Sequence, residues 1–105
     1  MQWYNQKTRN LFTAILALEN QSEAKKFFRD LLTETEIIEF SNRWQAAQML
    51  NKNISYTEIT KNTGLSSTTV ARISKWLNRG SDGYKLMLKR LGLHHNSPSY
   101  RKGLC

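Results

Sequence analysis

The sequence predicts an all-α fold on three observations. Apolar residues recur every three or four positions over most of the chain, which is the period of a helix. No run alternates apolar and polar residues as a half-buried strand would, and helix-capping residues and glycines separate the periodic segments. The chain has 105 residues, enough for one domain with a modest core. We expect this domain over residues 1–92 and a flexible basic tail over residues 93–105.

Three helices are expected in the first half of the chain. The first runs from about residue 6 to residue 19, and Ser22 caps a short second helix. Thr33 and Glu36 form a capping box, in which each side chain accepts a hydrogen bond from the other residue's backbone N–H. This box opens a long helix that ends near residue 51, with its apolar face at Ile37, Phe40, Trp44, Ala47 and Leu50.

A helix-turn-helix is predicted over residues 55–79. Ser55, with a glutamate three residues later, is placed as a capping box for the first helix. Gly64 can end that helix in the left-handed conformation at no steric cost, and Ser66 or Ser67 then caps the second helix. The positions at which two such helices contact each other carry apolar residues, namely Ile59, Leu65, Val70, Ile73 and Leu77.

Two further features complete the order of elements. Thr60 stands where a helix-turn-helix usually has alanine or glycine, and it fits if its hydroxyl bonds back to a carbonyl. The sequence GSDG at residues 80–83 breaks the second helix, and a last helix is expected over residues 84–91, before Gly92. Trp44 and Trp76 lie on apolar helix faces, so both are expected in the core.

Positive charge is concentrated in the half of the chain that holds the helix-turn-helix. The whole chain has a net charge of +8. Residues 1–53 hold 7 Lys/Arg and 6 Asp/Glu, whereas residues 54–105 hold 9 and 2. Such a surface attracts a polyanion, and the counterions released from DNA favour binding. Double-stranded DNA is therefore the expected partner, whereas a membrane would need a lipid anchor or an amphipathic basic helix that the sequence lacks.

Side chains at the start of the second helix of the motif are predicted to read DNA bases. Short hydroxyls can approach base edges directly or through water, and an arginine can bond N7 and O6 of guanine. This base-reading set consists of Ser66, Ser67, Thr68, Thr69 and Arg72. Phosphate contacts are expected from Lys61, Lys75 and Arg79, and secondarily from Lys52, Lys85, Arg101 and Lys102. A phosphate contact or a surface salt bridge is the alternative for Arg72, and a solvated charge is the alternative for each lysine.

A symmetric homodimer is also expected. The first two helices carry more apolar side chains than one long helix can cover, namely Leu11, Phe12, Ile15, Leu16, Phe27, Phe28, Leu31 and Leu32. The alternative is that this stripe packs within a single chain. A dimer would place two motifs about one DNA turn apart, roughly 34 Å, where they could read a palindrome.

The residues give no support to an enzyme, a cofactor or a metal site. No pair of carboxylates suggests acid–base chemistry, and the GSDG segment lacks the lysine of a phosphate-binding loop. His94 and His95 are adjacent and lie in the predicted tail, so they would not converge on a metal ion. Cys105 is the only cysteine, which precludes an internal disulfide and is consistent with a cytoplasmic location. Neither a secretory signal nor a membrane span is expected.

The long capped helix followed by SYTEITKNTGLSSTTVAR resembles the Trp-repressor family, and in particular its YerC/YecD-type branch. The similarity covers about residues 10–91 and includes the segment GYKLMLKRL after the glycine-bearing break. It implies an intertwined all-helical homodimer whose N-terminal helices interlock. It also implies that the second helix of the motif binds DNA and that the protein regulates transcription, with repression as the expected sign.

The resemblance raises the question of a tryptophan corepressor. In the repressor proper, the indole lies between two arginines, to which Arg72 and, with a one-residue shift, Arg43 correspond. Ile73 would crowd such a pocket, and Trp76 lies one turn beyond Arg72, where it could fill the space of a free indole. We therefore expect that no tryptophan binds, although an effector of another kind is left open. The alternative function is a helical adaptor whose basic face meets an acidic protein or RNA.

Overall fold

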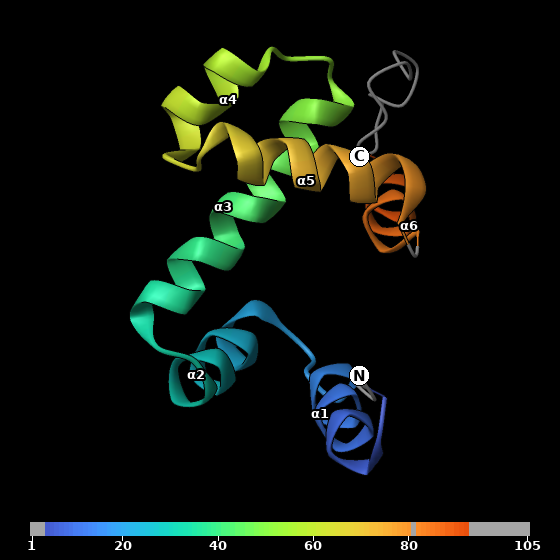
Figure 1. The fold of residues 1–105 in the computed structure, drawn as a ribbon. Helices are drawn as coiled ribbons and strands as arrows, with labels where there is room; N and C mark the ends of the chain where they lie inside the picture. The colour runs from blue at the N-terminus through green and yellow to red at the C-terminus, as the bar shows by residue number, and fades with distance from the viewer. Residues whose placement is uncertain (1–3, 81, 93–105) are drawn as a thin grey trace. The chain divides into compact units, whose positions relative to one another are not determined.

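The computed structural model describes residues 4–80 and 82–92, and all regular structure in them is helical, as predicted (Figure 1). The helices are α1 (Gln6–Leu16), α2 (Gln21–Leu31), α3 (Glu34–Asn51), α4 (Tyr56–Thr63), α5 (Ser67–Arg79) and α6 (Gly83–Arg90). The chain divides into two compact units, Met1–Ile37 and Ile38–Cys105, here called unit 1 and unit 2. The predicted tail, with His94, His95, Arg101, Lys102 and Cys105, lies outside the described residues, as do Trp3 and Ser81.

The helices of unit 1 begin at asparagine caps. Asn5 accepts hydrogen bonds from the N–H groups at residues 7 and 8, and its own N–H donates to Thr8 Oγ1 at 2.8 Å. Asn20 caps α2 by accepting from the N–H of Glu23 at 2.9 Å. The prediction that Ser22 caps this helix is therefore wrong, because the asparagine oxygen already reaches the N–H three residues on. Helix α1 also ends at residue 16, earlier than predicted, and neither α1 nor α2 contains a buried residue.

Helix α3 begins as predicted and buries part of the predicted face. The Thr33 hydroxyl accepts from the N–H of Glu36 at 3.1 Å, and the Glu36 carboxylate accepts from the N–H of Thr33 at 2.9 Å, which completes the capping box. Phe40, predicted on the buried face, is 48% exposed. Ala47, which was predicted on this face, is fully buried, and Trp44 and Leu50 pack partly buried against the core. Ala46 and Met49, which were not predicted there, are buried as well. Small side chains let neighbouring helices approach closely, which accounts for the complete burial of the two alanines.

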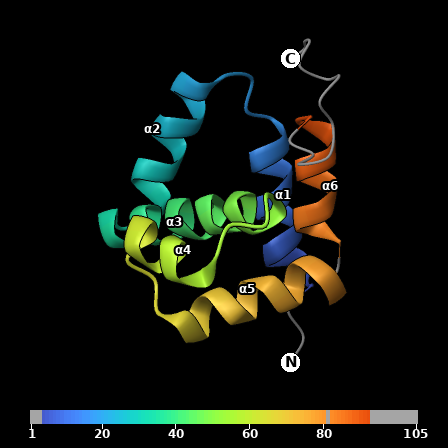
Figure 2. The same ribbon diagram turned by 90° about the horizontal axis from the view of Figure 1, so that it is seen from above.

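The core lies in unit 2 and joins α3 to the helix-turn-helix. One cluster of buried residues comprises Ala46, Ala47, Met49, Ile59, Val70 and Ile73. Partly buried residues pack against it, namely Trp44, Leu50, Ile54, Leu65 and Tyr84. Within unit 2, α5 contacts both α4 and α6 (Figures 1 and 2). The apolar positions predicted for the motif are therefore confirmed, because Ile59, Val70, Ile73 and Leu77 are buried and Leu65 packs on them.

Short-range hydrogen bonds shape the turn between α4 and α5. Gly64 has φ +77°, the left-handed conformation expected of it. Thr63, which the sequence analysis did not single out, is buried: its hydroxyl donates to the carbonyl of Ile59 at 2.8 Å and accepts from the N–H of Leu65 at 3.2 Å. The Thr60 hydroxyl donates to a carbonyl three residues back at 2.9 Å, as its position required. The turn is thus fixed by local bonds that need no distant partner.

Candidate nucleic-acid interface

Helix α5 has one buried side and one open side. Val70, Ile73 and Leu77 anchor it in unit 2, where they are 0%, 1% and 8% exposed. On the other side, Ser67, Thr68 and Arg72 are exposed. Because the buried side is packed into the core, the exposed side is held on a rigid support.

The start of α5 is capped by Ser66. The Ser66 hydroxyl accepts from the N–H of Thr69 at 3.1 Å and donates to the Thr69 hydroxyl at 3.0 Å. Thr69 is half-buried, so it is the least accessible member of the predicted base-reading set. The exposed members are Ser66, Ser67, Thr68 and Arg72. Of the two serines predicted as alternatives, Ser66 is the cap, and the N-terminus of α5 presents hydroxyls and one guanidinium to solvent.

Five of the seven residues predicted to contact phosphate lie on the surface of unit 2, and the other two, Arg101 and Lys102, lie outside the described residues. Lys61 is on α4, Lys75 and Arg79 are on α5, Lys52 follows α3, and Lys85 is on α6; all five are exposed. None of the five forms an ion pair with an acidic group of residues 4–80 and 82–92. Their charges are therefore available to a polyanion.

A small cavity brings together the three residues predicted to form a ligand pocket. Arg43, Arg72 and Trp76 line it, and the remaining lining residues are Glu39, Thr69 and Ile73. Its volume is ≈160 Å³, below the range of about 300–1,000 Å³ usual for ligand sites. The Arg43 guanidinium forms an ion pair with Glu39 and lies 5.6 Å from the centre of the Phe40 ring. A carboxylate of the chain itself thus already neutralises one of the two arginines.

Trp76 is not a core residue, contrary to the prediction, because it is 49% exposed. Tyr84 from α6 takes the place next to the core instead: its ring stacks on Trp44 with centroids 6.3 Å apart and an interplanar angle of 16°. Burial raises the pKa of the Tyr84 hydroxyl above 10.0, and the positive charge of Arg43 partly offsets this rise. The role of Tyr84 was missed because its sequence neighbours gave no sign that α6 reaches Trp44.

Residues 4–80 and 82–92 contain neither a candidate membrane span nor a candidate metal cluster. No helix there has the length and apolar character needed to cross a bilayer. Nor do three or more His, Cys, Asp or Glu side chains gather there as a metal ion would require. The features that stand out in these residues are the open side of α5 and the cations around it.

Residues 6–92 match the sequence family described as Trp repressor protein. The chain is 38% identical over 81 residues to the uncharacterized protein YerC of Bacillus subtilis (strain 168), covering 77% of this chain and 78% of that protein. A crystal structure of a TrpR-like protein from Eubacterium eligens has a TM-score of 0.84 and 39% identity, over 89% of this chain and 96% of the other. A crystal structure of a protein from Staphylococcus aureus also has a TM-score of 0.84. It is 36% identical in sequence, over 90% of this chain and 95% of the other.

Proposed function

Since the chain belongs to the Trp repressor family, we propose that it is a cytoplasmic, sequence-specific regulator of transcription that binds double-stranded DNA as a homodimer. The observation that carries this proposal is the exposed start of α5, with Ser67, Thr68 and Arg72 open to solvent on a helix whose other side is buried. Helix-turn-helix repressors, Trp repressor among them, insert this part of their second helix into the major groove. Repression is the sign of regulation that we propose.

Base reading is assigned to the open side of α5. The hydroxyls of Ser67 and Thr68 are short enough to approach base edges closely or through one water, and the Thr68 methyl can contact a thymine methyl. Arg72 is the one long donor in this set, so it is assigned to guanine N7 and O6. Thr69 supports the helix start through its bond with Ser66 and has a smaller part in reading bases.

Phosphate contacts are assigned to the cations around α5, which form no ion pair within residues 4–80 and 82–92. Lys61 precedes the turn, and Lys75 and Arg79 follow along the helix. Lys52 and Lys85 are assigned secondary contacts, as both are exposed in the same unit. Contacts of this kind position the protein on DNA and make the affinity depend on salt.

The proposed dimer is supported by the apolar character of unit 1. Helices α1 and α2 bury no residue, and Leu16 and Leu31 are 84% and 46% exposed. Apolar surface of this kind is covered in soluble proteins by a partner. Sedimentation equilibrium should give twice the mass of 12.3 kDa, and Leu16→Glu should shift the protein toward monomer. A monomeric wild type at DNA-binding concentrations would contradict the dimer.

We propose regulation without tryptophan as corepressor. The cavity at Arg43 and Arg72 has a volume of ≈160 Å³, and Trp76 forms part of its wall. The Arg43–Glu39 ion pair already supplies a carboxylate there. Titration calorimetry should therefore detect no saturable binding of free tryptophan, and binding in the micromolar range would contradict this proposal.

The main experiment separates base reading from phosphate contact. Selection of bound fragments from random DNA gives the preferred site, and affinities are then measured on that site and on bulk DNA over a range of salt. Arg72→Ala should weaken binding to the preferred site by about 1–3 kcal/mol and leave binding to bulk DNA unchanged. Lys61→Gln should weaken binding to all DNA and should lower the dependence of log affinity on log salt concentration by about one unit. Arg90→Gln, on the exposed surface of α6, is the charge control. Equal binding of any polyanion would instead favour the basic adaptor.

A further inference from the structure

Ala71 lies in the middle of the open side of α5. It is exposed, as are Ser67 and Thr68, which precede it by four and three residues, and Lys75, which follows it by four. Residues at these spacings are direct neighbours on the surface of a helix. Ala71 therefore lies on the same surface as the residues assigned to base reading, although it has neither a hydroxyl nor a guanidinium.

The side chains at this part of the helix surface are small. Ser67, Thr68 and Ala71 lie next to one another there, and the first long side chain of this set along the chain is Arg72. The major groove of DNA is about 12 Å wide and admits a helix, and small side chains let the helix backbone come close to the base edges. A base that faces Ala71 can thus touch its methyl group.

The methyl group of Ala71 favours one kind of base edge. It can neither donate nor accept a hydrogen bond, so an amino group of adenine or cytosine held against it would lose its bond to water without a replacement. Thymine instead presents a 5-methyl group in the major groove, and apolar contact with alanine covers that group. Thymine is therefore the base that Ala71 can select.

The hydroxyls beside Ala71 complement thymine in a second way. The Ser66 hydroxyl is engaged in the helix cap, whereas those of Ser67 and Thr68 form no hydrogen bond within the described part of the chain. Thymine carries the acceptor O4 next to its 5-methyl group. A hydroxyl of Ser67 or Thr68 can donate to O4, directly or through a water, while Ala71 contacts the methyl group.

We propose that Ala71 is a further specificity-determining residue, whose methyl group contacts the 5-methyl group of a thymine in the preferred DNA site. The inference rests on the proposed function and deepens it, because it names one base that the open side of α5 reads. The contact is apolar, unlike the hydrogen bonds assigned to Arg72, and it carries sequence information, unlike the phosphate contacts.

Replacement of single thymines by uracil tests this contact. Uracil pairs as thymine does and lacks only the 5-methyl group. Each thymine of the preferred site is replaced in turn, and the affinity of the wild type is measured at fixed ionic strength. At one or more thymines the change should weaken binding about fourfold, the effect of losing one buried methyl group. A preferred site in which no thymine responds would overturn the inference and leave the proposed function in place.

Variants locate the methyl contact at Ala71. The readout is the ratio of the affinities for the thymine and uracil forms of the site, in which any loss common to both DNAs cancels. Ala71→Gly removes the methyl group and Ala71→Ser makes it polar, so each should lower this ratio from about four toward one. Arg72→Ala is the control, because it should weaken binding to both forms and leave the ratio unchanged.

The neighbouring methyl group of Thr68 is tested in the same way. Thr68→Ser removes that methyl group and keeps the hydroxyl, so it should leave the ratio unchanged at the thymine that responds to Ala71→Gly. Loss of the ratio in Thr68→Ser but not in Ala71→Gly would assign the contact to Thr68 and overturn the inference.

The outcomes separate this inference from the proposed function. Circular dichroism shows whether each variant folds. An unchanged ratio in folded Ala71→Gly and Ala71→Ser would overturn the role of Ala71 alone, since the wild type would still select its site. Absence of any preferred site would contradict the proposed function, and the inference would fall with it.

Discussion

Replacing Gly64 by alanine isolates the conformational cost of the turn between α4 and α5. Gly64 has φ +77°, and a Cβ built on it would meet no atom within 4 Å. No steric clash therefore contributes, and the cost is that of the left-handed conformation, about 1–2 kcal/mol for an L-residue. Alanine also restricts the unfolded chain, which offsets about 0.4–1 kcal/mol of this cost. The net loss in free energy of unfolding is expected to be about 1 kcal/mol.

Gly83 provides a matched control for this substitution. A Cβ at Gly83 would also meet no atom within 4 Å, but its φ lies outside the left-handed region. Only the effect on the unfolded chain remains, so Gly83→Ala should stabilise the protein by about 0.4–1 kcal/mol. Both variants are measured by urea unfolding at one protein concentration, because assembly would make stability depend on concentration. If Gly64→Ala were as stable as Gly83→Ala, the backbone argument for the turn would be wrong.

The remaining predictions concern side chains that support the motif. Thr63→Val removes the hydroxyl that bonds Ile59 and leaves the N–H of Leu65 without this acceptor. It should lower the free energy of unfolding, measured in urea, by about 1–3 kcal/mol. The control Thr57→Val, at an exposed position, should change it by no more than about 0.5 kcal/mol. Tyr84 has a raised pKa, so the folded protein keeps a proton that the unfolded chain releases. The resulting stability is present below about pH 10 and is lost as pH rises through the folded pKa. Unfolding from pH 8 to 11 should therefore show a smaller alkaline loss for Tyr84→Phe than for exposed Tyr56→Phe, and identical profiles would contradict the assignment.

Local features of the fold could be predicted from the sequence because their causes are local. The cap at Ser66, the capping box at Thr33 and the left-handed Gly64 each depend on residues within four positions. The open side of α5 followed from the same reasoning, since its buried residues recur at helical spacing. Asn20 was missed as a cap although its position carries the same signal, because Ser22 offered a competing one.

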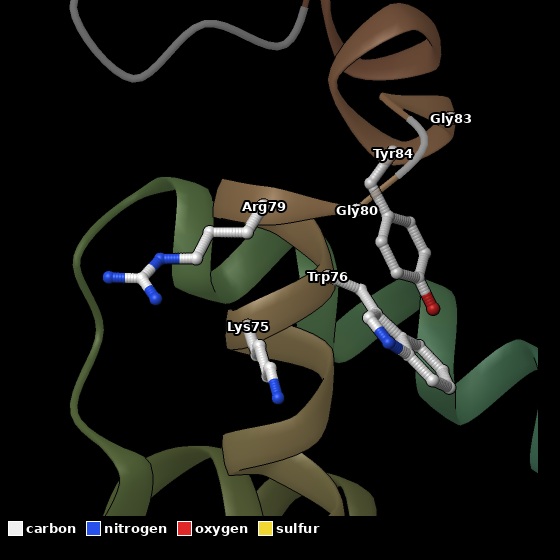
Figure 3. A pocket seen from close by; sticks show the side chains of 6 residues that line it. All are labelled: Lys75, Trp76, Arg79, Gly80, Gly83 and Tyr84. Carbon is white, nitrogen blue, oxygen red and sulfur yellow. The ribbon is translucent and has the colours of Figure 1, made fainter.

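Features that depend on distant residues could not be predicted in this way. Hydrophobicity favoured both Phe40 and Ala47 for the buried side of α3, but Phe40 is exposed, whereas Ala47 and its neighbour Ala46 are fully buried, where small size permits close approach. Trp76 was expected in the core because it lies on an apolar face of its helix. The sequence does not show that Tyr84, from the next helix, is the residue that stacks on Trp44. A cavity between the end of α5 and the start of α6 could not be predicted for the same reason, because its residues come from both helices (Figure 3).

The separation of outward and inward residues on α5 affects how the proposed DNA-binding preference can change. Ser67, Thr68 and Arg72 face outward, so exchanging them leaves the packing of Val70, Ile73 and Leu77 intact. Substitutions at such surface positions usually change stability by no more than about 0.5 kcal/mol. Under the proposed function, a new operator preference can therefore arise by a single substitution on the outward side, whereas the shape of the core limits substitutions on the inward side.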